Sequence, residues 1–278
     1  MYVRRPAVAG SFYPSDPDKL RSMISGYIAE AEKETVAYSE TLYGIVSPHA
    51  GYIYSGPVAA YGFSYLKKCK CDGFVVIAPS HRARYNGASV LPEGAYRTPL
   101  GEIETDSEIG TALIQAENFA YIKEIDEPEH SLEVQLPFLQ VVKPEAKIVP
   151  VVIGTIDLQL CKRIGESIGD TLKSYGKNYG IIISTDLSHY YPYKKAVEMD
   201  GEFISALKSF DENAIADAVR KGKGEACGEG ALIAGIVACR KLGAERVEIV
   251  KYANSGDTAG SKDEVVGYVS AVILGKEQ

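Results

Sequence analysis

The stretch YGIIISTDLSH, residues 179–189, is a run of apolar residues that leads to a histidine, and it has two counterparts in the chain. YGIVSPH occupies residues 43–49, and FVVIAPSH occupies residues 74–81. Short, nearly continuous apolar runs bounded by turn-forming residues are typical of strands that are buried on both faces. Because parallel strands of this kind are covered by helices on both sides, the three stretches predict an α/β fold.

The segments between these runs carry helical patterns. Asp16 and Pro17 indicate the N-cap and first turn of a helix that reaches about Glu34. Further helices are expected at residues 56–68, 106–117, 130–141, 158–175, 194–209, 212–221 and 230–242. Within residues 130–141, Pro137 should either kink the helix or mark where two shorter turns meet. Further strands are expected at residues 147–154, 247–252 and 265–274, the last two as an antiparallel pair, and residues 88–103 should form short strands or loops. This alternation predicts a central, largely parallel or mixed sheet in a single domain over residues 1–278.

Composition and charge exclude several kinds of partner. The 278 residues include 30 basic and 37 acidic side chains, a net charge of −7, which should repel nucleic acid and anionic lipid surfaces. No stretch is apolar enough for a membrane span or a signal peptide, so a cytoplasmic protein without a membrane partner is expected. The five cysteines should be reduced thiols, and Cys69 and Cys71 in KKCKCDG suit a solvated loop better than a metal pair.

Histidine comes directly after a predicted strand three times, at His49, His81 and His189. Ligands of open α/β sheets bind beyond the carboxyl ends of the strands, so we expect these three side chains to converge on one site. Imidazole is the commonest metal ligand in proteins. Two histidines with one anionic ligand and open positions suit Fe(II) or Zn(II).

Two residues are candidates for the anionic ligand. Cys227 in GKGEACGEGA precedes a predicted helix, whose N-terminus should favour the thiolate and lower the pKa of this cysteine. Asp186 is the carboxylate alternative. His130 and Glu133 in EPEHSLEVQLPF are spaced for one helical face and could orient a substrate or support the ligands, although an ordinary ion pair explains the same spacing.

Seven short motifs in this order resemble the Memo family over nearly the whole chain: RRPAVAGSFYP, SPHAGYIYSG, APSH, EHSLEVQLPF, STDLSHY, ACGEGA and VVGYVS. That family is similar to the class III extradiol ring-cleaving dioxygenases in its fold, a single three-layer α/β/α domain, and in the position of its pocket. The resemblance implies that His49 and His81 ligate a metal and that His189 acts as acid and base. Cys227 stands where the dioxygenases place a glutamate ligand. Microbial relatives often occur beside an AMMECR1-like protein and a radical-SAM protein, which implies a shared pathway.

Three functions fit these residues. The first is a non-haem Fe(II) oxidoreductase with His49, His81 and Cys227 as ligands and His189 as the proton-transfer group, with copper or zinc as alternative metals. The second is a metal-binding or peptide-binding protein without turnover that uses the same pocket. The third is a metal-free thiol enzyme in which Cys227 is the nucleophile, His189 its base and Asp186 the orienting carboxylate. In each case the partner is a small molecule or peptide of unknown identity.

Overall fold

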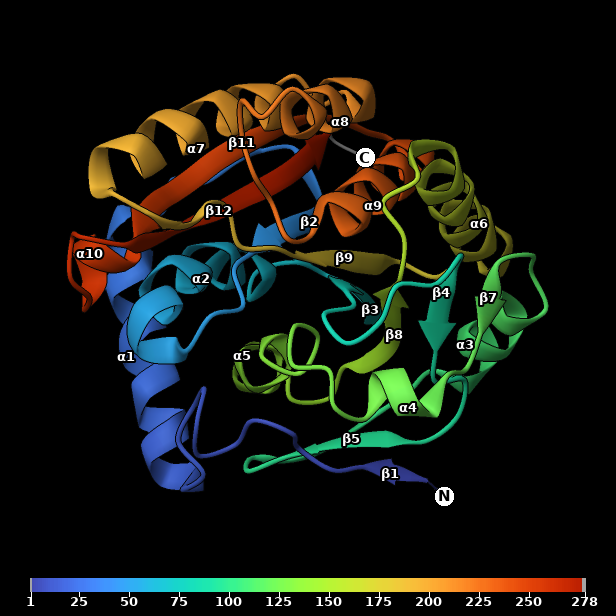
Figure 1. The fold of residues 1–278 in the computed structure, drawn as a ribbon. Coiled ribbons are helices and arrows are strands. Elements are labelled where there is room, and N and C mark those ends of the chain that lie inside the picture. The colour runs from blue at the N-terminus through green and yellow to red at the C-terminus, as the bar shows by residue number, and fades with distance from the viewer. Residues whose placement is uncertain (1, 277–278) are drawn as a thin grey trace.

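A nine-stranded mixed sheet lies at the centre of the computed structural model, which describes residues 2–276 (Figure 1). In pairing order its strands are β10 (His189–Tyr191), β12 (Val265–Gly275), β2 (Thr41–Ser47), β9 (Tyr179–Ser184), β3 (Gly73–Pro79), β8 (Lys147–Ile153), β4 (Ala88–Val90) and β7 (Phe119–Ala120), and β11 (Ala244–Asn254) also pairs with β12. The central strands β2, β9, β3 and β8 are mutually parallel, whereas β12 is antiparallel to β2, β10 and β11. The predictions of a largely parallel or mixed sheet and of an antiparallel last pair are confirmed.

Helices cover both faces of this sheet (Figure 1). Along β3, the side chains of Val75 and Ile77 pack into one apolar core, while Phe74 and Val76 pack into the other. The first core includes side chains of α3 (Ser107–Ile114), α6 (Leu158–Tyr175), α7 (Tyr193–Lys208), α8 (Glu212–Arg220) and α9 (Glu229–Leu242), and the second includes those of α1 (Pro17–Glu34), α2 (Tyr52–Leu66) and α5 (Gln135–Val142). Because successive side chains of a strand point to opposite faces, a strand between two helical layers is apolar throughout. The expected three-layer α/β/α architecture is confirmed.

A second, small sheet and two short helices complete the fold. The small sheet contains β1 (Val3–Arg4), β5 (Ala95–Thr98) and β6 (Gly101–Glu104), so the expected short strands within residues 88–103 are present. The short helices are α4 (Lys123–Asp126) and α10 (Ser255–Thr258). Within residues 2–276, none of the helices combines the length and the apolar character that a membrane crossing requires.

Two helices begin elsewhere than predicted. Helix α2 begins at Tyr52, whose N–H donates to the carbonyl of Phe12, and the helix continues through Pro57. Helix α5 begins at Gln135, five residues later than expected, so Pro137 lies in its first turn. A proline there removes an N–H that has no partner within the helix. Both predictions for Pro137, a kink in a longer helix and a junction of two shorter turns, are therefore wrong.

Candidate metal centre

All four histidines of the chain line one cavity of about 500 Å³, which we call the histidine cavity. The parallel strands β2 and β3 end two residues before His49 and His81, so both histidines leave the sheet at the same edge. His130 lies in the turn before α5, and His189 is the first residue of β10. The cavity is also lined by the aromatic side chains of Phe12, Tyr54, Tyr190 and Tyr268.

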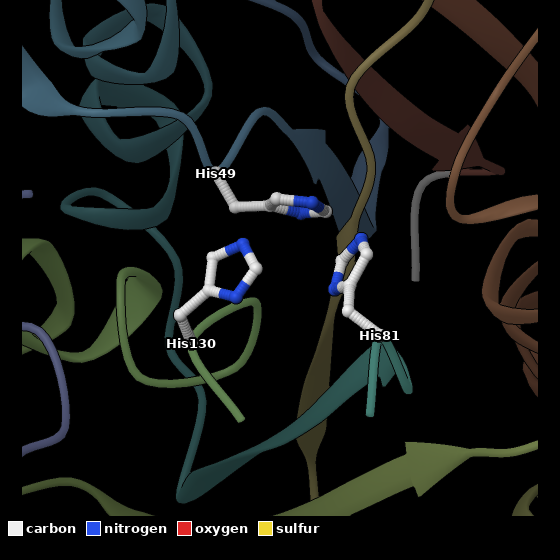
Figure 2. A group of neighbouring side chains, drawn as sticks. All are labelled: His49, His81 and His130. Carbon is white, nitrogen blue, oxygen red and sulfur yellow. The ribbon is translucent and has the colours of Figure 1, made fainter. Parts of the chain in front are cut away.

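Three of these imidazoles face one another across a common centre (Figure 2). One nitrogen atom of His49, one of His81 and one of His130 lie within 4.8 Å of each other. The ring centroids are 5.2 Å apart for His49 and His81, 5.6 Å for His49 and His130, and 4.6 Å for His81 and His130. Three ring nitrogens at such separations are an arrangement that a transition-metal ion could bind.

Hydrogen bonds behind His49 determine which of its nitrogens is free. The hydroxyl of Ser184 donates its single proton to the carbonyl of Ser131 at 2.7 Å and accepts from the Nε2 amide of Gln135 at 2.8 Å. It must therefore accept, not donate, in its 2.8 Å contact with Nδ1 of His49. Burial lowers the pKa of His49 well below its usual value, so the ring is neutral, with a lone pair on Nε2. A metal ligand needs this protonation state.

Glu129 organises the other two histidines, although the sequence analysis did not select it. Its Oε1 lies 3.0 Å from Nδ1 of His81 and accepts the backbone N–H groups of His130 and Ser131, while Oε2 accepts the N–H of His81. Burial would raise the pKa of Glu129, but the hydrogen bonds from His81 and Ser131 and the charge of His81 lower it to about 2. Burial lowers the pKa of His130 to about 4. The only sequence signal for this role is that a glutamate directly precedes His130.

Replacing Glu129 by glutamine should weaken metal binding about 10- to 100-fold, because a neutral amide orients and polarises the His81 ring less than a carboxylate does. Isothermal titration with Fe(II) under nitrogen measures the difference. Glu127→Gln is the matched control, since Glu127 lies two residues away and accepts a hydrogen bond from the Tyr2 hydroxyl outside the cavity. Equal affinities for both variants would mean that Glu129 does not support the metal ligand.

Cys227 and Asp186 both contact His49. The sulfur of Cys227 lies 3.2 Å from Nε2 of His49 and accepts the N–H of Asp186 at 3.2 Å, while Oδ1 of Asp186 accepts the N–H of His49 at 2.8 Å. Gly228 permits this approach, because a Cβ atom there would lie 2.5 Å from the carbonyl oxygen of Ser184. The Cys227 sulfur is nevertheless outside the group of mutually close ligand atoms, and it does not line the cavity.

The expected low pKa of Cys227 is wrong. Burial raises the pKa of this thiol, and the carboxylate of Asp186 raises it further, which outweighs the hydrogen bond from the N–H of Asp186. Burial also raises the pKa of Asp186. In the absence of a metal, the thiol of Cys227 is therefore protonated and faces the lone pair of His49.

His189 lines the same cavity, together with Asp186 and Tyr190. The residue before His189 is anchored to a neighbouring helix, because the N–H of Ser188 donates to Oδ1 of the buried Asp200 in α7 at 3.0 Å. The next residue, Tyr190, has a φ of 63°, and its side chain is 70% exposed. A left-handed backbone is costly for tyrosine, and strained residues of this kind cluster at functional sites.

Glu133 does not share a face with His130, because residues 130–134 form turns instead of the first turns of α5. The buried carboxylate of Glu133 pairs with the guanidinium of Arg4 and accepts the N–H groups of Ala7 and Val8 and the hydroxyl of Tyr13. It does not line the histidine cavity. Its visible role is to hold the N-terminal segment against the domain.

Comparison with known proteins relates almost the whole chain to one family. The family model described as Memo-like protein matches residues 4–272. A MEMO1 family protein of Methanopyrus kandleri is 39% identical, with 97% of this chain and 98% of the relative covered. Similar proteins of Methanosarcina mazei and Methanothermobacter thermautotrophicus are 37% and 34% identical, covering 98% and 96% of this chain and 100% and 98% of the relatives. The chain belongs to the Memo family.

Proposed function

We propose that this protein is a non-haem iron oxidoreductase that acts on a small molecule or peptide in the histidine cavity. The observation that carries the proposal is the convergence of His49, His81 and His130 on one centre. Copper and zinc are the alternative metals, because imidazole suits all three. Iron bound at this centre would supply redox chemistry towards O₂ or another oxidant.

The residues present fit a metal ion. His49 is held as the neutral tautomer by Ser184, and the carboxylate of Glu129 lies behind the ring of His81. Partners of this kind commonly orient the histidines of metal sites. The cavity beside the three rings is large enough for a small substrate, and its aromatic walls suit an apolar or aromatic group.

The third ligand is either His130 or Cys227. His130 has the better placement, because its nitrogen is close to those of both other histidines. Cys227 has the better charge, since a thiolate would neutralise part of the charge of a divalent ion, and its sulfur already touches Nε2 of His49. Metal binding would also remove the thiol proton that burial otherwise retains.

His189 and Asp186 have separate roles in this proposal. His189 lines the cavity from β10, so its imidazole can take a proton from the substrate and return it. Asp186 positions the metal site, because its Oδ1 atom accepts the backbone N–H of His49, and its own backbone contacts Cys227.

The two other function classes differ from this one in measurable ways. A binding protein without turnover would use the same cavity and hold the same metal. A thiol enzyme is less well supported, because the pKa of the Cys227 thiol is raised and its side chain does not line the cavity that a substrate could enter. The pathway connection with AMMECR1-like and radical-SAM proteins remains a prediction from the family resemblance.

Protein purified without oxygen and reconstituted with Fe(II) should retain about one iron per chain after desalting, because the cavity contains one cluster of donors. Elemental analysis measures this, and the His130→Ala and Cys227→Ser variants then show which residue is the third ligand. Tyr54→Phe is the control, since it changes the cavity wall without removing a nitrogen or sulfur donor. Wild-type protein that retains no iron, copper or zinc would contradict the proposal.

A further inference from the structure

A pair of cysteines lies far from the histidines in the fold. Cys69 and Cys71 belong to the loop between α2 and β3, which precedes the amino end of β3, whereas His81 follows the carboxyl end of the same strand. Both side chains are half-buried and line a separate cavity of about 350 Å³. By contrast, Cys161 and Cys239 are fully buried.

The loop that carries the two thiols is anchored on both sides of them. Lys143 donates to the carbonyl of Cys69 at 2.6 Å, and Asn178 accepts the N–H of Asp72 at 2.7 Å and donates its own N–H back to the Asp72 carboxylate at 2.9 Å. Both thiols therefore lie at the wall of the same cavity, in a loop that is anchored on both sides of the pair, and they are not joined by a disulfide bond.

The two thiols differ in chemical character. The neighbouring thiol of Cys71 lowers the pKa of Cys69, against the effect of burial, and the charge of Lys143 lowers it further. The neighbouring Cys69 and burial raise the pKa of Cys71. Cys69 is therefore suited to be the attacking thiolate. Cys71 is suited to stay protonated until it attacks the mixed disulfide in a second step.

The surroundings favour a negatively charged ligand. Lys68 and Lys70 line the cavity with the two cysteines, together with the aromatic rings of Tyr38 and Tyr65, and Glu40 is the acidic residue in the lining. The positive charges of these lysines would repel a metal cation. Among the described residues, no histidine, further cysteine or carboxylate completes a metal-binding cluster with the two thiols.

We propose that Cys69 and Cys71 form a reactive dithiol site that reduces an anionic low-molecular-weight disulfide by thiol–disulfide exchange. The Cys69 thiolate attacks one sulfur of the disulfide, whose S–S bond breaks and releases one thiolate, which takes up a proton. Cys71 then gives up its proton and attacks the Cys69 sulfur of the mixed disulfide, and the second thiol is released. In total the dithiol loses two electrons and two protons and becomes an intramolecular disulfide, while one external disulfide becomes two thiols.

Oxidised glutathione, which is anionic, is the probe, and the cationic disulfide cystamine is its charge-reversed counterpart. After reaction, the remaining thiols are alkylated, and the chymotryptic peptide of residues 67–74 is analysed by mass spectrometry. In the wild-type protein, the mass of this peptide should fall by two hydrogen atoms, as expected for an intramolecular disulfide, and no glutathione should be attached to it. Oxidised glutathione should react about tenfold faster than cystamine, after correction for their rates with a free cysteine peptide.

Single variants separate the two roles. Cys71→Ser should accumulate one glutathione on Cys69, because the second step has no thiol, and Cys69→Ser should react at least about tenfold more slowly. A wild-type peptide that remains a dithiol in excess oxidised glutathione would overturn the proposal. So would equal rates for both single variants, or Zn(II) binding that depends on both cysteines in a His49→Ala, His81→Ala background.

Discussion

The His49→Ala variant is expected to bind Fe(II) more than about a hundredfold more weakly than the wild type, a larger loss than removal of a supporting hydrogen bond causes. His49 is 2% exposed, and one of its ring nitrogens lies within 4.8 Å of a nitrogen of both His81 and His130, so its loss removes one of the three clustered donors. Calorimetric titration with Fe(II) under nitrogen measures the affinity. His81→Ala should behave in the same way.

His189→Ala is the matched control, because it removes an imidazole from the same cavity but not from the three-histidine cluster. Its Fe(II) affinity should stay within about tenfold of the wild type, a difference of about 1.4 kcal/mol. Under turnover, the same variant should lower the rate by roughly 10²- to 10⁴-fold, as expected for a positioned proton-transfer group. An equal loss of iron in His49→Ala and His189→Ala would make His189 a ligand. Full iron retention by both His49→Ala and His81→Ala would rule out the metal site.

The Glu133→Ala variant should be destabilised by about 3–5 kcal/mol, the usual cost of removing one partner of a buried ion pair. The side chains of Arg4 and Glu133 are 1% and 0% exposed, so the guanidinium would remain buried without its carboxylate. The N–H groups of Ala7 and Val8 and the hydroxyl of Tyr13 would lose their acceptor as well. Urea unfolding followed by circular dichroism measures the free energy of unfolding.

Glu30→Ala is the control for this experiment, because Glu30 pairs with Lys33 on an exposed face of α1 and should contribute at most about 1 kcal/mol. A double variant, Arg4→Met with Glu133→Leu, should recover only part of the loss. It removes the unpaired charge but still leaves two N–H groups and a hydroxyl without an acceptor. A Glu133→Ala protein as stable as Glu30→Ala would show that the pair contributes little to the fold.

Much of the fold is predictable from the sequence because the deciding signals are local. The apolar runs that become β2, β3 and β9 are buried on both faces, and each of the long helices between them has its own apolar spacing. The starts of α2 and α5 are not predictable in this way. Their positions depend on prolines whose tolerance is determined by tertiary contacts and by their place in the helix.

The candidate site is also predictable only in part, and again the predictable part is the one with a local sequence signal. His49, His81 and His189 share an edge because the strands before them are parallel neighbours, and a strand-end rule is sufficient to group them. Glu129 and His130 lie between helices α4 and α5, where the sequence has no helical or strand periodicity from which to predict their positions. Their place at the site depends on contacts with distant segments, such as that of Glu129 with His81. The pKa of Cys227 is determined mainly by its burial. Its position before a predicted helix gives no information about burial.

The attachment of the N-terminal segment to Glu133 also bears on the order in which the cavity assembles. Arg4 and Glu133 are 129 positions apart in the sequence, so their contact closes a long loop, and contacts of this range form slowly. Phe12, whose ring lies 4.9 Å from that of His130, can reach the cavity only with that segment. The wall next to His130 is therefore completed only when this segment docks, whereas the parallel strands alone bring His49 and His81 to one edge of the sheet. The histidine cavity thus combines an early-forming sheet edge with a wall that depends on a late, long-range contact.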